Sequence, residues 1–139
     1  YRALLVSNLL AIHQKKYIGK LSAFCGAVSA GYACGAAITY MLGGNFNQIA
    51  NTIINTLANT SGIICDGAKP SCAAKISSAL DAALLAHTMS MHDDVFHADE
   101  GIVKDDLEKT IRAVGYIGRE GMKSTDIEVL NIMIDKVCP

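Results

Sequence analysis

The spacing of apolar residues along this chain predicts helices from one end to the other. Near the start, apolar residues recur every three to four positions, which predicts a first helix of about four turns that ends near Lys15-Lys16. The same period continues over residues 46–57, where Asn45 is expected to cap the start of another helix. No segment alternates convincingly as a strand would. The pattern therefore predicts an all-α protein.

Further helices are expected in the second half. One is predicted from about residue 71 to 89, and exposed amphipathic helices are predicted at about 103–113 and 125–136. Thr125 and Glu128 have the spacing of a capping box at the start of the last helix. Of the 25 charged residues, 17 lie at or beyond Asp93, so these later helices are expected to meet solvent.

The middle of the chain is free of charge. From Leu21 to Cys65 there is no Asp, Glu, Lys or Arg, and small residues recur at helical spacing in the first half of this segment. Such a stripe lets another backbone approach closely, which predicts a central, buried, Gly/Ala-rich helix. Residues 21–42 are also long enough to span a membrane. Their modest hydrophobicity favours the buried helix and a protein without a membrane span.

A stripe of asparagines follows on the next predicted helix. Four amides stand four residues apart, at Asn47, Asn51, Asn55 and Asn59. A solvent face usually carries Lys and Glu, so we interpret this face as one that meets a polar cavity or a part of the protein outside this sequence. An ordinary exposed polar face is the alternative.

Composition narrows the class of protein. A chain of 139 residues suits one domain, and a net charge of −1 without a basic patch argues against nucleic-acid binding. Five cysteines in a setting that is not rich in turns favour reduced thiols in a cytoplasmic protein over a disulfide framework. The chain begins at Tyr1 in the middle of an amphipathic pattern, and we interpret it as part of a longer polypeptide or as a proteolytic product.

Three cysteines are the candidate metal ligands. Cys65 and Cys72 flank a short loop that contains Gly67 and Pro70, and Cys25 is expected on a separate helix. The chain has no CxxC pair, which argues against a zinc finger and a redox dithiol. Three separated thiolates suit three irons of a [4Fe–4S] cluster whose fourth iron stays open to a substrate. Buried cysteines that only pack are the alternative, and we assign that role to Cys34.

Polar residues beside these cysteines are candidates for substrate binding. Asp66, Lys69 and Ser71 lie in the loop, where Ser71 is placed to donate to a substrate carboxylate. The same residues also suit a turn and a helix start. A competing metal site is conceivable further along the chain, but its spacing favours surface residues at a helix end: His87, His92, His97, Asp93, Asp94 and Asp99.

The run GIICDGAKPSCAAKISSALDAAL, preceded by the Gly/Ala-rich segment around Cys25, closely resembles the iron–sulfur L-serine dehydratase α-chain family. More narrowly, it is similar to the branch that contains L-cysteine desulfidases. The resemblance covers essentially all of residues 1–139, as the C-terminal helical portion of such proteins. It implies that Cys25, Cys65 and Cys72 ligate a [4Fe–4S] cluster.

The resemblance also implies β-elimination on a small L-amino acid: L-cysteine to pyruvate, ammonia and sulfide, or L-serine as the neighbouring substrate. In that family the general base lies in the N-terminal half, so the catalytic residues are unknown here and residues 1–139 alone are expected to be inactive. Cys138 is either a ligand that caps the open iron or a frayed terminal thiol. A homo-oligomer stays open, and so does a non-enzymatic, membrane-associated helical module.

Overall fold

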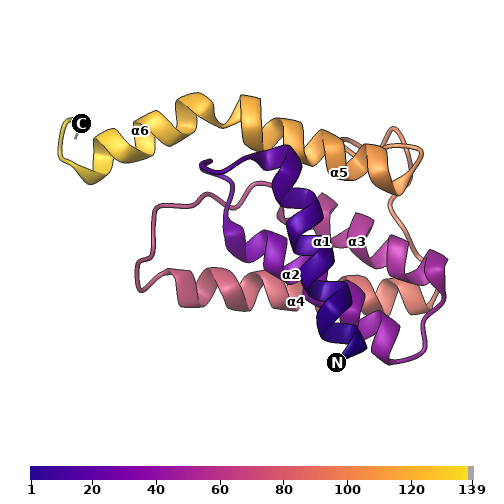
Figure 1. Ribbon diagram of the computed structural model, residues 1–139. Helices are drawn as coiled ribbons and strands as arrows, with labels where there is room; N and C mark the ends of the chain where they lie inside the picture. Colours follow the sequence, from indigo (N-terminus) through magenta and orange to yellow (C-terminus); the bar gives the residue numbers. More distant parts are fainter. Residues whose placement is uncertain (138–139) are drawn as a thin grey trace.

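The computed structural model describes residues 1–137 and is helical along most of this range (Figure 1). Its elements are α1 (Arg2–Ile18), α2 (Gly26–Met41), α3 (Phe46–Thr60), α4 (Cys72–Met91), α5 (Leu107–Tyr116), the π-helical turn η1 (Ile117–Gly121) and α6 (Lys123–Met133). Between residues 1 and 137, strand-like pairing is limited to an isolated antiparallel bridge of Phe24 with Ile64. The all-α prediction is confirmed.

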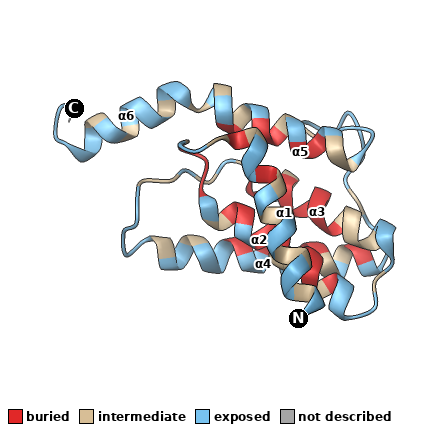
Figure 2. Ribbon diagram, viewed as in Figure 1, coloured by how far each residue is buried: buried red, intermediate tan, exposed pale blue. Residues whose placement is uncertain are grey.

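The Gly/Ala-rich helix α2 lies at the centre, as predicted. It packs against α1, α3 and α4, and the buried residues gather where these helices face one another (Figure 2). A Cβ atom added at Gly31 would lie 2.8 Å from the carbonyl oxygen of Ala79, and one added at Gly35 would lie 2.9 Å from the Cβ of Ala83. The small residues therefore allow α2 and α4 to pack backbone against backbone.

Among the described residues, none of the helices combines the length and the apolar character that crossing a membrane requires.

Helix α3 begins as predicted. The side chain of Asn45 accepts from the backbone N–H of Gln48, and the side chain of Gln48 accepts from the N–H of Asn45, with both distances 3.0 Å. These two bonds satisfy amide groups that the helix itself leaves free. The sequence predicts Asn45 alone as the cap. In the structure, Gln48 adds the reciprocal bond and completes a capping box.

The asparagine stripe does not form one functional face. Asn47 and Asn59 are exposed, whereas Asn55 is buried. Asn55 donates to the carbonyl of Asp94 at 2.9 Å and accepts from the N–H of Phe96 at 3.0 Å. Its amide thus holds the loop after α4, and the interpretation as a cavity or as a contact with an absent region is wrong for this residue.

Helix boundaries in the second half differ from the predicted ones. Helix α6 starts at Lys123 without a side-chain cap, so the predicted capping box of Thr125 and Glu128 is wrong. The reason is that η1 leads through Met122 into α6, which places Thr125 inside the helix. Helix α5 starts later than expected, where the side chain of Asp106 accepts from the N–H of Lys109. No residue of α6 is buried, and this helix extends away from the bundle in Figure 1.

Helix α1 forms as predicted, but it extends past the predicted end near Lys15-Lys16 and buries a different face. It ends at Ile18, because Gly19 leaves the helix with a φ of 96°. The apolar residues that predicted it, Leu4, Leu5, Leu9 and Ile12, are 59–65% exposed, and the buried positions of the helix are Gln14 and Ile18. The surface of α1 thus presents a row of apolar side chains that nothing in residues 1–137 covers.

Candidate metal centre

An extended segment places Cys25 at the start of α2. The N–H of Cys25 donates to the carbonyl of Ile63 at 3.1 Å, and the N–H of Cys65 donates to the carbonyl of Ala23 at 2.6 Å. These bonds form the bridge between Phe24 and Ile64 and tie two cysteine segments together. Cys25 is the N-cap of α2 with an extended φ and ψ of −67° and 126°, so the prediction that it lies on a helix is wrong by one residue.

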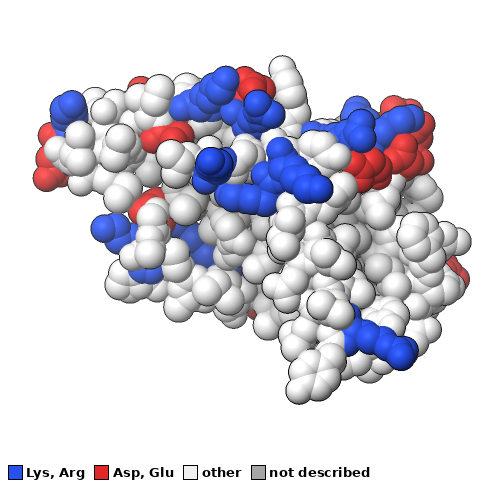
Figure 3. Space-filling model, viewed as in Figure 1, with Lys and Arg blue, Asp and Glu red and all other residues white. Residues whose placement is uncertain are grey.

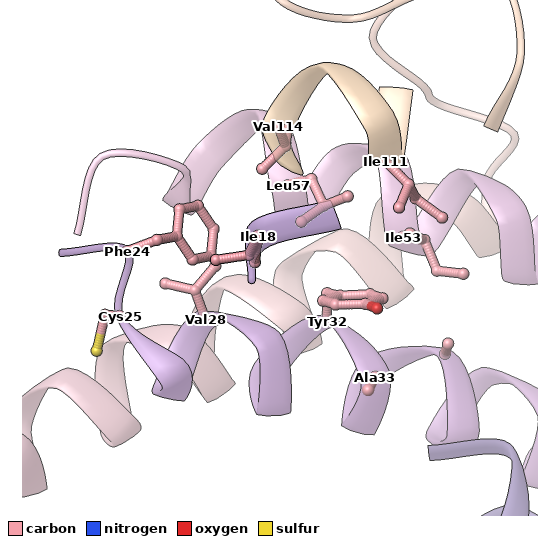
Figure 4. Packing of buried hydrophobic residues seen from close by; sticks show 11 residues of the cluster. Ile18, Phe24, Cys25, Val28, Tyr32, Ala33, Ile53, Leu57, Ile111 and Val114 are labelled. Carbon is pink, nitrogen blue, oxygen red and sulfur yellow. The ribbon is translucent and has the colours of Figure 1, made fainter. Parts of the chain in front are cut away.

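Extended backbone directs neighbouring side chains to opposite sides. Figure 4 shows Phe24 directed into the buried cluster and the sulfur of Cys25 directed away from it. The same short segment therefore anchors the core through Phe24 and presents a thiol on the other side.

The third cysteine opens α4. The Sγ of Cys72 donates to the carbonyl of Gly67 at 3.2 Å, which closes the loop between Cys65 and Cys72. Gly67 has a φ of 85°, a left-handed conformation that glycine adopts without a steric cost. This turn brings the loop back so that Cys72 approaches the other two cysteines.

All three predicted cysteines line one cavity of about 410 Å³. They come from three places in the chain: the N-cap of α2, the segment after α3, and the first residue of α4. The remaining lining residues are small or apolar: Gly26, Ala27, Ala30, Gly67, Ala68 and Ile76. The structure thus brings together the cysteines that the sequence reading selected.

The donor set suits a cluster better than a single ion. Cys25, Cys65 and Cys72 are free thiols. Among residues 1–137, no three His, Cys, Asp or Glu side chains converge as a site for one metal ion. Each thiolate of an iron–sulfur cluster binds a different iron, so its cysteines stand around a space and do not meet at a point. Three thiols around an apolar-walled cavity therefore fit such a group.

Cys34 lies outside this cavity. It lines an adjacent, smaller hollow of about 210 Å³ between α2 and α4, which shares Ala27, Ala30 and Ile76 with the cysteine cavity. Cys34 is half-buried. Cys34 lies nine residues after Cys25, in the middle of α2, and a position outside the cysteine cavity agrees with the packing role predicted for it.

An ion pair stands beside the three cysteines. Lys75 Nζ donates to Asp66 Oδ1, and Lys75 follows Cys72 by one helical turn while Asp66 directly follows Cys65. This bond lowers the pKa of Asp66. It also raises the pKa of Lys75, with smaller contributions from Cys25 and Cys72. The sequence reading did not select Lys75 as a site residue, although its spacing of three from Cys72 was the available signal.

The other two candidates for substrate binding face solvent. Lys69 and Ser71 are exposed in the loop before α4. Ser71 is the N-cap of that helix, but its side chain makes no capping bond. Asp66, by contrast, is already engaged with Lys75. The three residues lie beside the cavity, and their role toward a substrate stays a prediction.

In the part of the chain that the structure describes, the side chains of the histidine-rich segment do not converge as ligands of one metal ion. His87 Nδ1 lies 2.9 Å from Thr39 Oγ1, which places this ring in a polar contact between α4 and α2. His92 and His97 are exposed, as are Asp93, Asp94 and Asp99. The prediction of surface residues agrees with the structure for these five residues and is wrong for His87, which is half-buried. Cys138, the proposed cap of an open iron, lies outside the described residues.

Comparison with known proteins identifies the family. The sequence model of the serine dehydratase alpha chain family matches residues 1–131. The chain belongs to this family. The resemblance to the serine dehydratase α-chain family is thereby confirmed, and the family is related to iron–sulfur serine dehydratase subunits.

Relatives of high identity are named only as UPF0597 proteins. The one from Treponema denticola is 60% identical over 133 residues, which cover 96% of this chain and 31% of the relative. Those from Lachnoclostridium phytofermentans and Finegoldia magna are 58% and 54% identical, over 96% and 98% of this chain and 32% and 33% of their own length. The chain thus spans about a third of these relatives. No solved structure matches it.

Proposed function

We propose that the protein to which these residues belong is a [4Fe–4S]-dependent lyase that carries out β-elimination on a small L-amino acid, with L-cysteine as substrate. The observation that supports this proposal most directly is the single cavity that Cys25, Cys65 and Cys72 line together. Membership of the serine dehydratase alpha chain family supports the class of reaction.

The three cysteines would hold the cluster. When bound, the cluster supplies an open iron that acts as a Lewis acid toward the leaving group of the substrate. The bridge between Phe24 and Ile64 fixes Cys25 relative to Cys65. The bond from Cys72 to Gly67 fixes the loop between Cys65 and Cys72. The other residues that line the cavity are small or apolar, so the three thiols are the metal-binding groups that it offers.

The elimination balances without an external oxidant. Loss of the α-proton and of the β-sulfur from L-cysteine gives an enamine, which tautomerises to an imine. Water then hydrolyses the imine to pyruvate and ammonia, and the sulfur leaves as sulfide. Lys69, Ser71 and the Asp66–Lys75 pair are the polar residues beside the cavity that would bind the substrate.

The rest of the protein would complete the site. The relatives are about three times as long as this chain, and the general base is expected in their N-terminal portion. The exposed apolar row on α1 suits a contact with that portion, since Leu4, Leu5 and Leu9 are each more than half exposed.

Turnover by the full-length protein tests this proposal. Under anaerobic conditions, L-cysteine should give pyruvate, ammonia and sulfide in equal amounts, and Cys65→Ser should abolish the reaction. Cys34→Ser is the matched control, since it removes a thiol from the neighbouring hollow and should leave the rate within about twofold. Residues 1–139 alone should give no pyruvate.

The substrate is decided by the same assay. A kcat/KM for L-serine above that for L-cysteine would assign the protein as an L-serine dehydratase. No product from either amino acid by an iron-loaded, folded protein would contradict the lyase proposal. Product formation that survives Cys65→Ser would contradict the role of the cluster.

A further inference from the structure

Lys75 is positioned between two of the cysteine segments. It lies on the same face of α4 as Cys72, three residues later, and its ammonium group is bound to Asp66, the residue after Cys65. Its side chain is only 21% exposed. The ion pair with Asp66 thus holds the side chain of Lys75 at the edge of the cysteine cavity. Without this bond the side chain would extend into solvent.

The cavity itself contains no compensating charge. Among the described residues that line it, all are cysteine, glycine, alanine or isoleucine. Three thiolates together with an iron–sulfur core carry net negative charge, and apolar walls screen that charge poorly. The ammonium group of Lys75 is held next to two cysteine segments, because Asp66 directly follows Cys65 and Lys75 lies one helical turn after Cys72. A cation fixed at this position would stabilise negative charge in the cavity.

We propose that Lys75 is a positioning residue for the metal centre: its ammonium group, held by Asp66, offsets the negative charge of the cluster bound by Cys25, Cys65 and Cys72 and sets its reduction potential. This inference rests on the proposed function, because it requires a cluster at these cysteines. It goes beyond that function by assigning a role to a residue that would not bind the iron.

A purely structural role for the ion pair makes a different prediction. The pair links residues 66 and 75 across the loop, and loop closure alone would depend equally on both partners. An electrostatic role depends on the sign of the charge. Removing the positive charge destabilises the reduced, more negative cluster and therefore lowers its potential. Removing the negative charge of Asp66 does not.

The test is the midpoint reduction potential of the cluster in the full-length protein, reconstituted anaerobically with iron and sulfide and followed by electron paramagnetic resonance. We expect Lys75→Met to shift the potential to more negative values and Lys75→Arg to leave it near that of the wild type. Asp66→Asn should not shift it downward. Lys109→Met, which removes a lysine of α5 that pairs with Asp105, is the matched control and should change nothing.

Each outcome decides the proposal. A Lys75→Met protein with full iron content and an unchanged potential would overturn it, and so would equal downward shifts in Lys75→Met and Asp66→Asn. If Lys75→Met retains no iron, retention by Lys75→Arg supports the need for a cation and loss from both overturns it. A wild-type protein without a cluster would defeat the proposed function itself, which separates the two failures.

Discussion

At the scale of single residues, the side chains of Phe24 and Cys25 point to opposite sides of one extended segment. This arrangement explains how the thiol of Cys25 is held rigidly beside the hydrophobic core. Phe24 is buried in the main hydrophobic cluster with Ile18 and Val28, and the backbone of this segment is fixed by the bridge to Ile64. The sulfur of Cys25 therefore has little freedom to move. A ligand held in place before the metal arrives loses less conformational entropy on binding.

A second residue-scale feature joins α1 to α5. Glu108 accepts a hydrogen bond from the hydroxyl of Tyr17 at 2.6 Å and lies 2.8 Å from the Nε2 of His13. Arg112 donates to the same carboxylate at 3.2 Å. These bonds, that of Tyr17 foremost, lower the pKa of Glu108 from 4.5 to about 2.

This shift predicts a pH dependence of stability. Since the pKa of Glu108 is lower in the folded chain than in the unfolded one, its contribution is present above pH 4.5 and is lost as the pH falls toward 2. We expect Glu108→Gln to lower the free energy of unfolding at pH 7 by roughly 1 kcal/mol, because solvent screens a side chain that is 41% exposed.

Urea denaturation between pH 7 and pH 2 measures this effect. The wild type should lose stability relative to Glu108→Gln as the pH falls below 4.5. A constant difference between the two proteins over this range would contradict the role given to the Glu108 carboxylate.

At the scale of elements, the close contact of α2 with α4 supports the cysteine cavity. Both helices begin at this cavity, with Cys25 capping α2 and Cys72 opening α4. Their separation is set further along by Gly31 and Gly35. A change in that separation would therefore alter the distance between two of the proposed ligands.

Gly31→Ala tests this contact. The added Cβ would stand 2.8 Å from a backbone oxygen of α4, so the helices must move apart, which we expect to cost about 1–3 kcal/mol of the free energy of unfolding. Gly26→Ala is the control, since nothing lies within 4 Å of its added Cβ, and it should be neutral or stabilising in chemical denaturation. Equal stabilities of the two variants would contradict the packing argument.

The turn η1 supports the same region from the other side. A Cβ at Gly118 would lie 3.2 Å from the Cβ of Phe24, and the hydroxyl of Ser22 connects the carbonyl of Gly118 to the N–H of Phe24. The π-helical turn thus packs against the segment that leads to Cys25.

At the scale of the whole molecule, charged and apolar side chains occupy different parts of the surface. Figure 3 shows charged side chains gathered over α5, α6 and the end of α1, while the surface around the start of α1 is nearly uncharged. That apolar surface suits burial against the part of the protein outside these residues. The proposed metal centre, by contrast, lies beside charged residues, among them Asp66 and Lys75.

Much of this arrangement follows from the sequence. The period of apolar residues predicts the helices, and the charge-free, Gly-rich segment predicts the buried α2. The row of leucines on α1 predicts a helix but not its buried face, because apolar periodicity does not show which side of the helix packs against α2 and α5. The bridge of Phe24 with Ile64 and the pairing of Asp66 with Lys75 depend on contacts formed only by folding, which apolar periodicity does not encode.

The most direct test of the account is the iron and acid-labile sulfide content of the full-length protein after anaerobic reconstitution, measured beside Cys25→Ser, Cys65→Ser, Cys72→Ser and Cys34→Ser. We predict close to four of each per chain in the wild type and in Cys34→Ser, as one [4Fe–4S] cluster requires, and strongly reduced content in the other three variants. A folded wild type that binds no iron, or equal iron in all four variants, would contradict the assignment of these cysteines as cluster ligands.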